Sequence, residues 1–426
     1  MRIGFTAPGV PGHLNPMTTL ARKLKSRGHD VIFFGIPDAE PAAGAAGLDF
    51  FPVCQQRYPP GEHARQMHQL SLLSGAEALQ YTVHLFTEAC RAALEDGPRA
   101  MREMRADALV LDQVSRGFDL LAMHRGIPYV HVSNALHFDY SGHTPLCLFD
   151  WPHEAGLEAF ARNRQGVELF LKLTAKLTEL QREYAEGVGL KLNWEDPARS
   201  LSPPTSLTQT PKEFDFPSNH WPPQFHHTGP LHDGFGRVPA EFPWERLSGE
   251  PLIYASMGTL QNGSEGLFKT IVEGASAPGR QIVLSIGGNL KAERIGAVPA
   301  STIIVPYAPQ IDILKRASLC ITHAGLNTAL ECLAQGVPMV AIPVTNDQPG
   351  VGARIAYTGT GVVVPLKELA ADRLRVAVNS VLEDPSYGER ARCLQRAIEK
   401  TNGLEMATDL IEEAFGISGP AKTASA

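Results

Sequence analysis

The chain has 426 residues, of which 43% are apolar, 19% charged and 7% aromatic, and its formal net charge is −7 with histidine neutral. This composition is typical of a globular protein and excludes collagen-like and intrinsically disordered classes. The acidic balance, without any run of lysine or arginine, argues against nucleic acid as a partner, and no apolar run reaches the 18 residues of a transmembrane segment.

The first segments alternate between strand and helix patterns. Residues 2–8 have a strand pattern, residues 9–15 form a loop with glycine and proline, and a helix follows that Asn15 can cap and Pro16 can start. Further strands are predicted at residues 31–36, 106–112 and 127–133. Apolar strands that alternate with helices indicate a buried parallel sheet.

The texture changes before the middle of the chain and predicts a domain boundary. Eleven of the 55 residues from 197 to 251 are proline, against 33 in all 426. Strand and helix patterns restart at residue 251. The sequence therefore predicts two doubly wound, Rossmann-like α/β domains that face a central cleft: residues 1–235 and 251–416, with a linker at 236–250 and a disordered tail at 417–426.

The cysteines and the amino terminus indicate a cytoplasmic location. The six cysteines, at positions 54, 90, 147, 320, 332 and 393, form no CxxC pair and show no metal-ligand spacing. This usage favours reduced thiols over a disulfide framework. The first residues contain Pro8 within a short apolar stretch, so they do not read as a signal peptide.

Two polar residues stand at predicted strand ends in the first half. His13 follows the turn residues Gly9 and Gly12, and Asp112 ends an apolar strand. In open α/β sheets, ligands bind outside the carboxyl ends of the strands, where a carboxylate can orient an imidazole for general-base catalysis. By itself, however, a loop histidine is more often a turn residue, and Asp112 could equally cap the next helix.

In the second half, residues 307–348 carry the most informative pattern. A strand ends at His323, a turn of small residues reaches Gly325, and Asn327 or Thr328 opens a helix. The N–H groups at such a helix start suit a diphosphate. A similar turn lies at residues 256–259, although ordinary βα loops also need glycine and either turn alone is weak evidence.

The same stretch resembles the nucleotide-sugar signature of family 1 UDP-glycosyltransferases. That signature runs W-x-P-Q, then H-x-G-x-N-[ST]-x-x-E, then [DE]-Q, and every element is present except that Tyr307 replaces tryptophan. The N-terminal loop G-x-P-G-H-x-N-P extends the resemblance over nearly the whole chain. The segments SNALHFDY, TPKEFDFP, TGPLHD and YASMGTLQN are similar to bacterial zeaxanthin glucosyltransferase-like and macrolide-type glycosyltransferases.

The resemblance implies a GT-B fold and an inverting, metal-independent transfer of a sugar, we expect glucose, from a UDP-sugar, with no further cofactor. His13 would be the general base and Asp112 would orient it. Tyr307 would stack on uracil, Glu331 would accept hydrogen bonds from the ribose, and Asp347 would bind the sugar. The full predicted donor site comprises Gly12, Gly258, Thr259, Ser285, Tyr307, Ala308, Gln310, His323, Gly325, Asn327, Thr328, Glu331, Asp347 and Gln348.

The acceptor is expected to lie against the N-terminal half, in the loops 55–85 and 134–151. Their apolar content suits a small lipophilic alcohol or phenol, such as a flavonoid or a carotenoid or terpenoid alcohol. The predicted lining is Met67, Leu70, Phe86, Asn134, His137, Phe138, Leu148, Phe149 and Trp151.

Other functions compete with this interpretation. Carbon-linked transfer to an activated aromatic ring needs the same base, so the motif does not separate it from oxygen-linked transfer. A nucleotide-sugar epimerase of the same fold would not be expected to carry His13 together with the complete signature. A non-catalytic partner protein that only holds a nucleotide sugar would be expected to lack His13 and Asp112.

Overall fold

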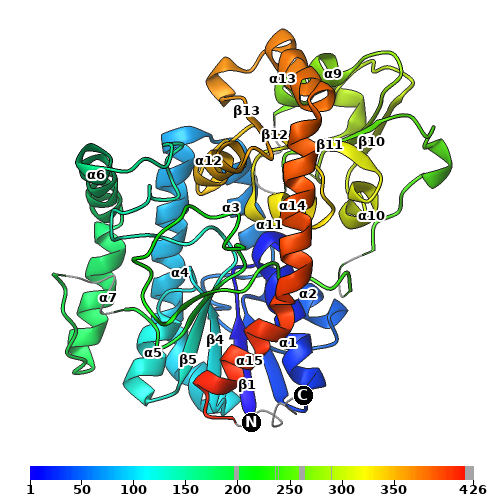
Figure 1. Ribbon diagram of the computed structural model, residues 1–426. Helices are drawn as coiled ribbons and strands as arrows, with labels where there is room; N and C mark the ends of the chain where they lie inside the picture. Colours follow the sequence, from blue (N-terminus) through cyan, green and yellow to red (C-terminus); the bar gives the residue numbers. More distant parts are fainter. Residues whose placement is uncertain (196–200, 236, 238, 259–263, 289, 418–426) are drawn as a thin grey trace, which may run out of the picture.

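In the computed structural model, two parallel β-sheets lie one above the other, each covered by helices on both faces (Figure 1). The structure describes residues 1–195, 201–235, 237, 239–258, 264–288 and 290–417. The predicted pair of doubly wound α/β units is confirmed.

The N-terminal sheet has the strand order β3-β2-β1-β4-β5-β6-β7, and all its pairings are parallel. Its strands are β1 (Arg2–Thr6), β2 (Asp30–Gly35), β3 (Asp49–Pro52), β4 (Ala108–Asp112), β5 (Tyr129–Ser133), β6 (Ser206–Thr208) and β7 (Phe225–His227). Its helical segments are α1 (Pro11–Ser26), η1 (Pro37–Ala39), α2 (Glu40–Ala45), α3 (Glu62–Ser71), α4 (Gly75–Met104), α5 (Phe118–Arg125), α6 (Leu157–Leu173) and α7 (Ala175–Gly187).

The C-terminal sheet has the order β10-β9-β8-β11-β12-β13, again parallel throughout. Its strands are β8 (Leu252–Ser256), β9 (Gln281–Ser285), β10 (Thr302–Val305), β11 (Ala317–Thr322), β12 (Met339–Ala341) and β13 (Gly361–Val363). Around it are η2 (Trp244–Arg246), α9 (Glu265–Ala275), η3 (Ala292–Arg294), α10 (Gln310–Leu314), α11 (Leu326–Ala334), α12 (Gln348–Thr358), η4 (Leu366–Glu368), α13 (Ala371–Glu383) and α14 (Pro385–Thr401), and the last helix is α15 (Gly403–Ala414).

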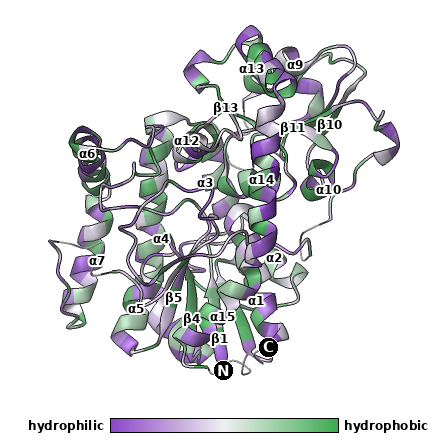
Figure 2. Ribbon diagram, in the orientation of Figure 1, coloured by the Kyte–Doolittle hydropathy of each residue, from purple (hydrophilic) through white to green (hydrophobic). Residues whose placement is uncertain are grey.

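Each sheet is apolar on both faces, which is why its strands read as continuous hydrophobic runs. Strands β4 and β5 are buried at every position. Figure 2 shows the hydrophobic strands inside and the hydrophilic colour on the outer helices. This burial directs polar function to the loops at the strand ends.

The last helix returns to the N-terminal half. Figure 1 shows α14 descending from the upper sheet and α15 lying beside α1. Residues Ala407, Ile411 and Phe415 join the apolar core beneath β1 and α1. The boundaries 1–235, 236–250 and 251–416 stay a prediction, but the packing groups α15 with the N-terminal sheet. Of the predicted tail, residues 418–426 lie outside the described residues.

Candidate active site

A histidine and an aspartate meet at the carboxyl ends of two adjacent strands in the N-terminal sheet. The chain leaves β1 and enters α1, which holds His13 in its first turn, and the neighbouring β4 ends at Asp112. His13 Nδ1 lies 2.7 Å from Asp112 Oδ2. The Asp112 side chain is fully buried, whereas the imidazole is 19% exposed. The imidazole is therefore the member of the pair that a substrate can reach.

Both carboxylate oxygens of Asp112 accept further hydrogen bonds that fix its position. The Asn134 side-chain amide donates to Oδ2 over 2.6 Å, and the Val114 amide donates to Oδ1 over 3.0 Å. Burial by itself lowers the pKa of His13, but the Asp112 carboxylate, assisted by Asp347, raises the pKa above its ordinary value. A buried carboxylate that orients a partly exposed imidazole in this way has the geometry that general-base catalysis requires.

The start of α1 differs from the sequence prediction. The helix begins at Pro11 rather than at Pro16, and Val10 precedes it without a side-chain cap. Pro11 suits a first turn because its missing N–H would have no intrahelical partner there. The prediction was wrong because Pro16, inside the helix, looked like a starting residue. His13 consequently sits on a helix and not in a loop.

Pro16 has a second consequence, at the junction of the two halves. A proline inside a helix cannot donate to the carbonyl four residues earlier, which here is that of Gly12. The Asn327 side-chain amide, from the first turn of α11, donates to this carbonyl over 2.6 Å. Asn327 Oδ1 accepts in turn from Gln209 over 2.8 Å. The predicted donor residues Gly12 and Asn327 thus touch each other across the two sheets.

Two glycines enclose the imidazole of His323 at the end of β11. A Cβ atom at Gly258 or at Gly325 would come within 2.5 Å of the ring. Both positions therefore require glycine, and Gly258 also has a φ of +70°. Burial lowers the pKa of His323 to about 4, so the ring is neutral at pH 7. The first turn of α11, which includes Thr328, follows directly and presents the helix N-terminus predicted for a diphosphate.

Glu331 lies on α11 and is 5% exposed. Its Oε1 accepts from Arg237 over 2.5 Å, and its Oε2 accepts from the Gln310 side-chain amide over 2.7 Å. Gln310 accepts in turn from the Tyr254 hydroxyl over 2.9 Å. Both carboxylate oxygens are therefore paired, and a ribose would have to share them or displace Arg237.

Tyr307 follows β10 and is 55% exposed. A Cβ at Gly288 would lie 2.6 Å from the Tyr307 hydroxyl, so the ring end approaches bare backbone. This exposed aromatic face can accept a stacked base. Ala308 adjoins it, and Ser285, at the end of β9, donates to the Pro306 carbonyl over 3.3 Å. Thr259, which the sequence also predicts as a donor residue, lies outside the described residues.

Asp347 and Gln348 stand where α12 begins. Asp347 Oδ2 accepts from the Leu136 amide of the N-terminal half over 2.8 Å. Burial raises the pKa of Asp347, against the opposing effects of that amide and of His13. Gln348 is 4% exposed, and its side-chain oxygen accepts from the Val344 and Thr345 amides. Asp347 is thus directed toward the His13 side of the junction.

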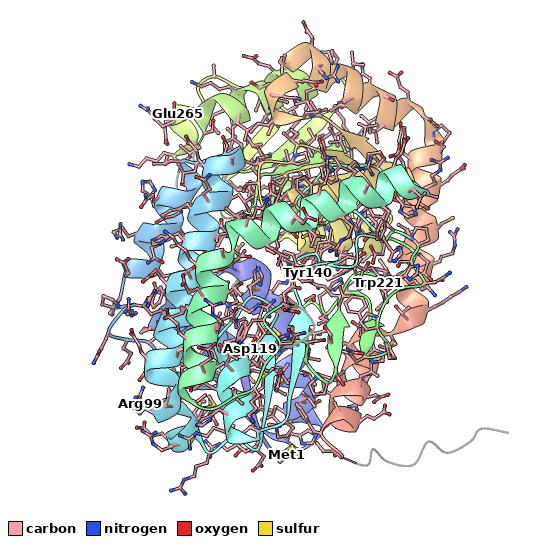
Figure 3. All side chains as sticks on the ribbon, turned by 90° about the vertical axis from the view of Figure 1, so that its left-hand side faces the viewer. Met1, Arg99, Asp119, Tyr140, Trp221 and Glu265 are labelled. Carbon is pink, nitrogen blue, oxygen red and sulfur yellow. The ribbon has the colours of Figure 1, made fainter. Side chains whose placement is uncertain are left out.

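The predicted acceptor residues divide into two groups. Asn134 contacts Asp112, as above, while Leu70 and His137 are buried at 2% and 3% exposure. The remaining residues are less buried and mostly pack on other apolar side chains. Phe138 stacks on Phe170 of α6, close to Tyr140, which is labelled in Figure 3. Phe149 stacks on Trp151. Leu148 and Phe86 pack against apolar cores, and Met67 lies on α3. No contact assigns an acceptor role to any of them.

His137, which is predicted to line the acceptor site, lies near Asp139 and His143 in the sequence, but the structure gives each of the three a different partner. His137 lies 3.2 Å from Asp215, Asp139 accepts from Thr144 over 2.7 Å, and His143 stacks on His220. Burial lowers the pKa of His137. Among the described residues, no group of three or more His, Cys, Asp or Glu residues could hold a metal ion.

Sequence reasoning missed several polar residues around these groups, namely Arg237, Gln209, Asp215 and Arg354. Their partners lie 94, 118 and 139 positions away along the chain. A local pattern carries no signal for pairings at this separation. The proline content near residues 211 and 239 indicates irregular segments there, and the TPKEFDFP segment contains Asp215, but neither pattern identifies the partners.

Comparison with known proteins gives a consistent result. Residues 212–404 match the family described as UDP-glucoronosyl and UDP-glucosyl transferase. The zeaxanthin glucosyltransferase of Pantoea ananas is 29% identical over 430 residues, which cover 98% of this chain and 97% of that protein.

Solved structures show the same fold over nearly the full length. The glycotransferase of kitacinnamycin superposes with a TM-score of 0.75 at 25% identity, covering 97% of this chain and 99% of that one. The spinosyn rhamnosyltransferase SpnG, complexed with thymidine diphosphate, gives a TM-score of 0.69 at 17% identity, with 96% and 100% covered. In the part of the chain that the structure describes, no helix is both long and apolar enough to cross a membrane.

Proposed function

We propose that this chain, a glycosyltransferase of the UDP-glycosyltransferase type with the GT-B fold, moves a hexose, with glucose as the expected sugar, from a UDP-sugar to a hydroxyl of a small lipophilic acceptor. The observation that carries the proposal is the His13–Asp112 contact of 2.7 Å opposite the donor signature of the other half. Two observations support a lipophilic acceptor: the similarity to the zeaxanthin glucosyltransferase of Pantoea ananas, and the apolar loops of the N-terminal half.

In the proposed mechanism, His13 uses the tautomer that donates Nδ1–H to Asp112, which leaves the Nε2 lone pair free. Nε2 removes the proton of the acceptor hydroxyl while the hydroxyl oxygen attacks the anomeric carbon. The bond from that carbon to the UDP phosphate oxygen breaks on the opposite face, so the configuration inverts. The proton stays on the imidazolium, which the Asp112 carboxylate stabilises.

The leaving diphosphate would be met by fixed dipoles on the C-terminal sheet. The start of α11 carries partial positive charge, and the neutral His323 ring, enclosed by Gly258 and Gly325, presents an N–H without adding a full charge. Asp347 and Gln348 would accept from the sugar hydroxyls. We include no metal ion or further cofactor in this mechanism, and a cytoplasmic location also remains a prediction.

Product analysis tests the proposed function directly. The purified chain is incubated with UDP-glucose and a panel of phenols, flavonoids and carotenoid alcohols, and the products are identified by mass spectrometry and nuclear magnetic resonance. A product heavier by one hexose, with a β-linkage at the anomeric carbon, would support inverting transfer to a hydroxyl. A carbon-linked product would favour the alternative reaction, and UDP binding without any transfer would favour a non-catalytic binding protein.

Glu331 provides a test of the donor nucleotide. The ribose of a UDP-sugar has two hydroxyls that can donate hydrogen bonds to the Glu331 carboxylate, whereas the deoxyribose of a dTDP-sugar lacks the 2′-hydroxyl. A hydrogen bond to a charged acceptor contributes about 1.5–3 kcal/mol, so we expect UDP-glucose to be preferred over dTDP-glucose by about 10- to 150-fold in kcat/KM. Glu331→Ala should remove most of this preference, mainly by weakening UDP-glucose use.

Arg237 must be separated from Glu331 in that test, because it pairs with the same carboxylate. Arg237→Ala is the matched control, because it frees the Glu331 carboxylate without removing it. This variant should keep the preference for UDP-glucose. Equal use of the two donors by the wild-type chain would refute the ribose contact.

A further inference from the structure

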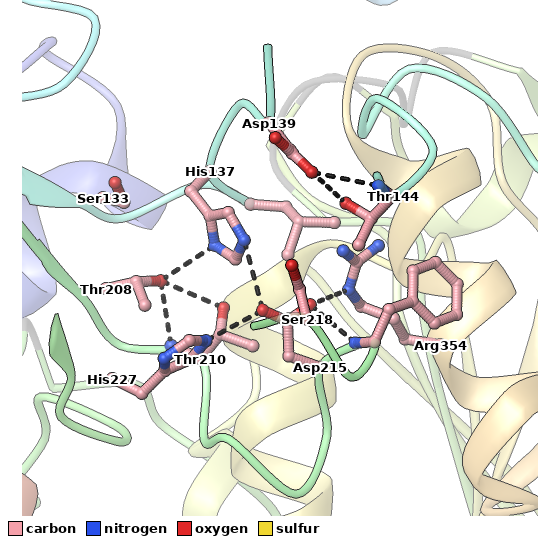
Figure 4. A network of polar contacts seen from close by, with 12 residues as sticks. Ser133, His137, Asp139, Thr144, Thr208, Thr210, Asp215, Ser218, His227 and Arg354 are labelled. Carbon is pink, nitrogen blue, oxygen red and sulfur yellow. Dashed lines mark hydrogen bonds and ion pairs between the residues drawn. The ribbon is translucent and has the colours of Figure 1, made fainter. Parts of the chain in front are cut away.

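A buried polar cluster joins the two halves away from His13. It consists of Asp215, which follows β6, His137 after β5, His227 at the end of β7, and Arg354 on α12 (Figure 4). We call it the Asp215 cluster. The side chains of Asp215 and Arg354 are 1% and 2% exposed. Asp215 lies in the TPKEFDFP segment, residues 210–217, to which the proposed mechanism gives no role.

Asp215 is held by donors from several segments. Oδ1 accepts from Arg354 Nε over 2.8 Å and from the Phe216 amide over 2.8 Å. Oδ2 lies 2.9 Å from His227 Nε2 and 3.2 Å from His137 Nε2. Burial by itself would raise the pKa of Asp215, but the Arg354 guanidinium and the imidazoles hold it well below its usual range. The carboxylate is therefore a fixed anion.

Arg354 is oriented just as firmly. Its Nη1 donates to the Gly350 carbonyl over 3.1 Å, and its guanidinium lies 4.2 Å from the centre of the Phe216 ring. A guanidinium group that contacts a carboxylate, a carbonyl and an aromatic ring has little rotational freedom. The pair thus joins α12 to the N-terminal half at a defined place.

The contact residues of α12 lie on one face of the helix. Asp347, at its start, accepts from the Leu136 amide, Gly350 donates to the Cys147 carbonyl over 2.9 Å, and Arg354 meets Asp215. Spacings of three and four residues place side chains on one face of a helix. The middle contact is tight, because a Cβ at Gly350 would lie 2.4 Å from the Cys147 oxygen. Rotation of α12 about its axis would break all three contacts and turn Asp347 away.

We propose that Asp215 and Arg354 are positioning residues for sugar recognition: by fixing the rotation of α12 against the N-terminal half, they hold Asp347 toward the His13 side of the junction. The inference rests on the proposed function and extends it from the residues that touch the donor to a pair that acts through one of them. This positioning role gives a function to the buried ion pair between the halves, because apolar packing alone does not fix a single rotation of a helix about its axis.

The test compares two ligands that differ only in the sugar. Binding of UDP and of UDP-glucose is measured by titration calorimetry for the wild-type chain, Arg354→Met, Asp347→Asn and the double variant. Arg354→Met should leave the affinity for UDP within about twofold and weaken UDP-glucose about tenfold, the loss expected for one hydrogen bond to a charged group. Asp347→Asn should show the same selective loss. The double variant should be no weaker than Asp347→Asn, because both changes remove one interaction.

Controls keep a structural role distinguishable. Arg280→Met removes another arginine contact, to Asn379 within the C-terminal half, and should change neither ligand's affinity. Asp215→Asn keeps the shape of the side chain and serves if Arg354→Met does not fold, as judged by circular dichroism. Equal weakening of both ligands, or losses from Arg354→Met and Asp347→Asn that multiply, would overturn the positioning role. Failure of the wild-type chain to bind either ligand would overturn the proposed function itself.

Discussion

The His13 imidazole is the group at which single-residue changes should separate chemistry from binding. His13 would act only on the acceptor proton, while most of the proposed donor contacts belong to the C-terminal half. His13→Ala should therefore lower kcat for an unactivated hydroxyl by about 10²–10⁴-fold and leave the affinity for UDP nearly unchanged. Steady-state kinetics and calorimetry check the two parts. A variant that kept more than a tenth of the wild-type kcat would contradict the assignment.

The effect of the Asp112 carboxylate on the pKa of His13 should be measurable in the pH dependence of kcat/KM. A general base works only when unprotonated, so kcat/KM should fall as the pH drops through the pKa of His13. Asp112 raises that pKa despite burial, which places the acidic limb above the ordinary histidine value of about 6.5. Asp112→Asn removes the cause, so the limb should move to lower pH while the maximal rate falls. An unmoved limb would assign the titration to another group.

At the scale of elements, α1 and α15 are joined by an ion-pair cluster between the start and the end of the chain. Arg27 donates to Glu405, Asp409 and Glu412 over 2.6–2.7 Å, and His29 lies 2.9 Å from Glu412. Arg27 is only 22% exposed. Networks of this kind exceed the contribution of an isolated surface pair, so we expect Arg27→Ala to cost about 1–2 kcal/mol of folding free energy.

In a cooperative unit of about 150–250 residues, the size of the N-terminal half, that loss should lower Tm by about 2–8 °C. Thermal denaturation followed by circular dichroism measures it, and added salt should shrink the difference between variant and wild type because salt screens the pairs. Arg373→Ala, which removes an exposed pair with Glu368, is the matched control and should leave Tm within about 1 °C. A Tm for Arg27→Ala as high as that of the control would show that apolar packing alone retains α15.

At the scale of the whole molecule, the two halves contact each other through polar groups that flank the candidate site and through apolar side chains such as Leu136, Cys147 and Phe214, which pack into the C-terminal core. Asn327 binds the Gly12 carbonyl, Asp347 binds the Leu136 amide, and Arg354 binds Asp215. Domains that enclose a ligand-binding cleft commonly move relative to one another when the ligand binds, so relative motion of the halves is expected. Small-angle scattering should show that saturating UDP-sugar reduces the radius of gyration. An identical curve with and without donor would contradict closure, though not the fold.

Several features of this protein follow from the sequence because they are local. Runs of apolar residues predict the strands, since a parallel sheet covered on both faces requires them. Asp112 and His323 could be placed at strand ends because they end or directly follow such a run, and His13 because it follows the glycine and proline turn after the first run. Gly258 and Gly325 belong to the same class, and the structure adds the reason, which is the room that the His323 ring needs.

Other features depended on tertiary structure because their partners are distant in sequence. The helix α1 begins at Pro11 and continues past Pro16, and the Gly12 carbonyl that Pro16 leaves free is bound by Asn327, which is distant in sequence. The pairing of Arg237 with Glu331 and of Arg354 with Asp215, like the return of α15 to α1, joins segments that no local pattern relates. A linear pattern reports which face of an element is buried, whereas the choice of a polar partner depends on which segments the folded chain brings within hydrogen-bond distance.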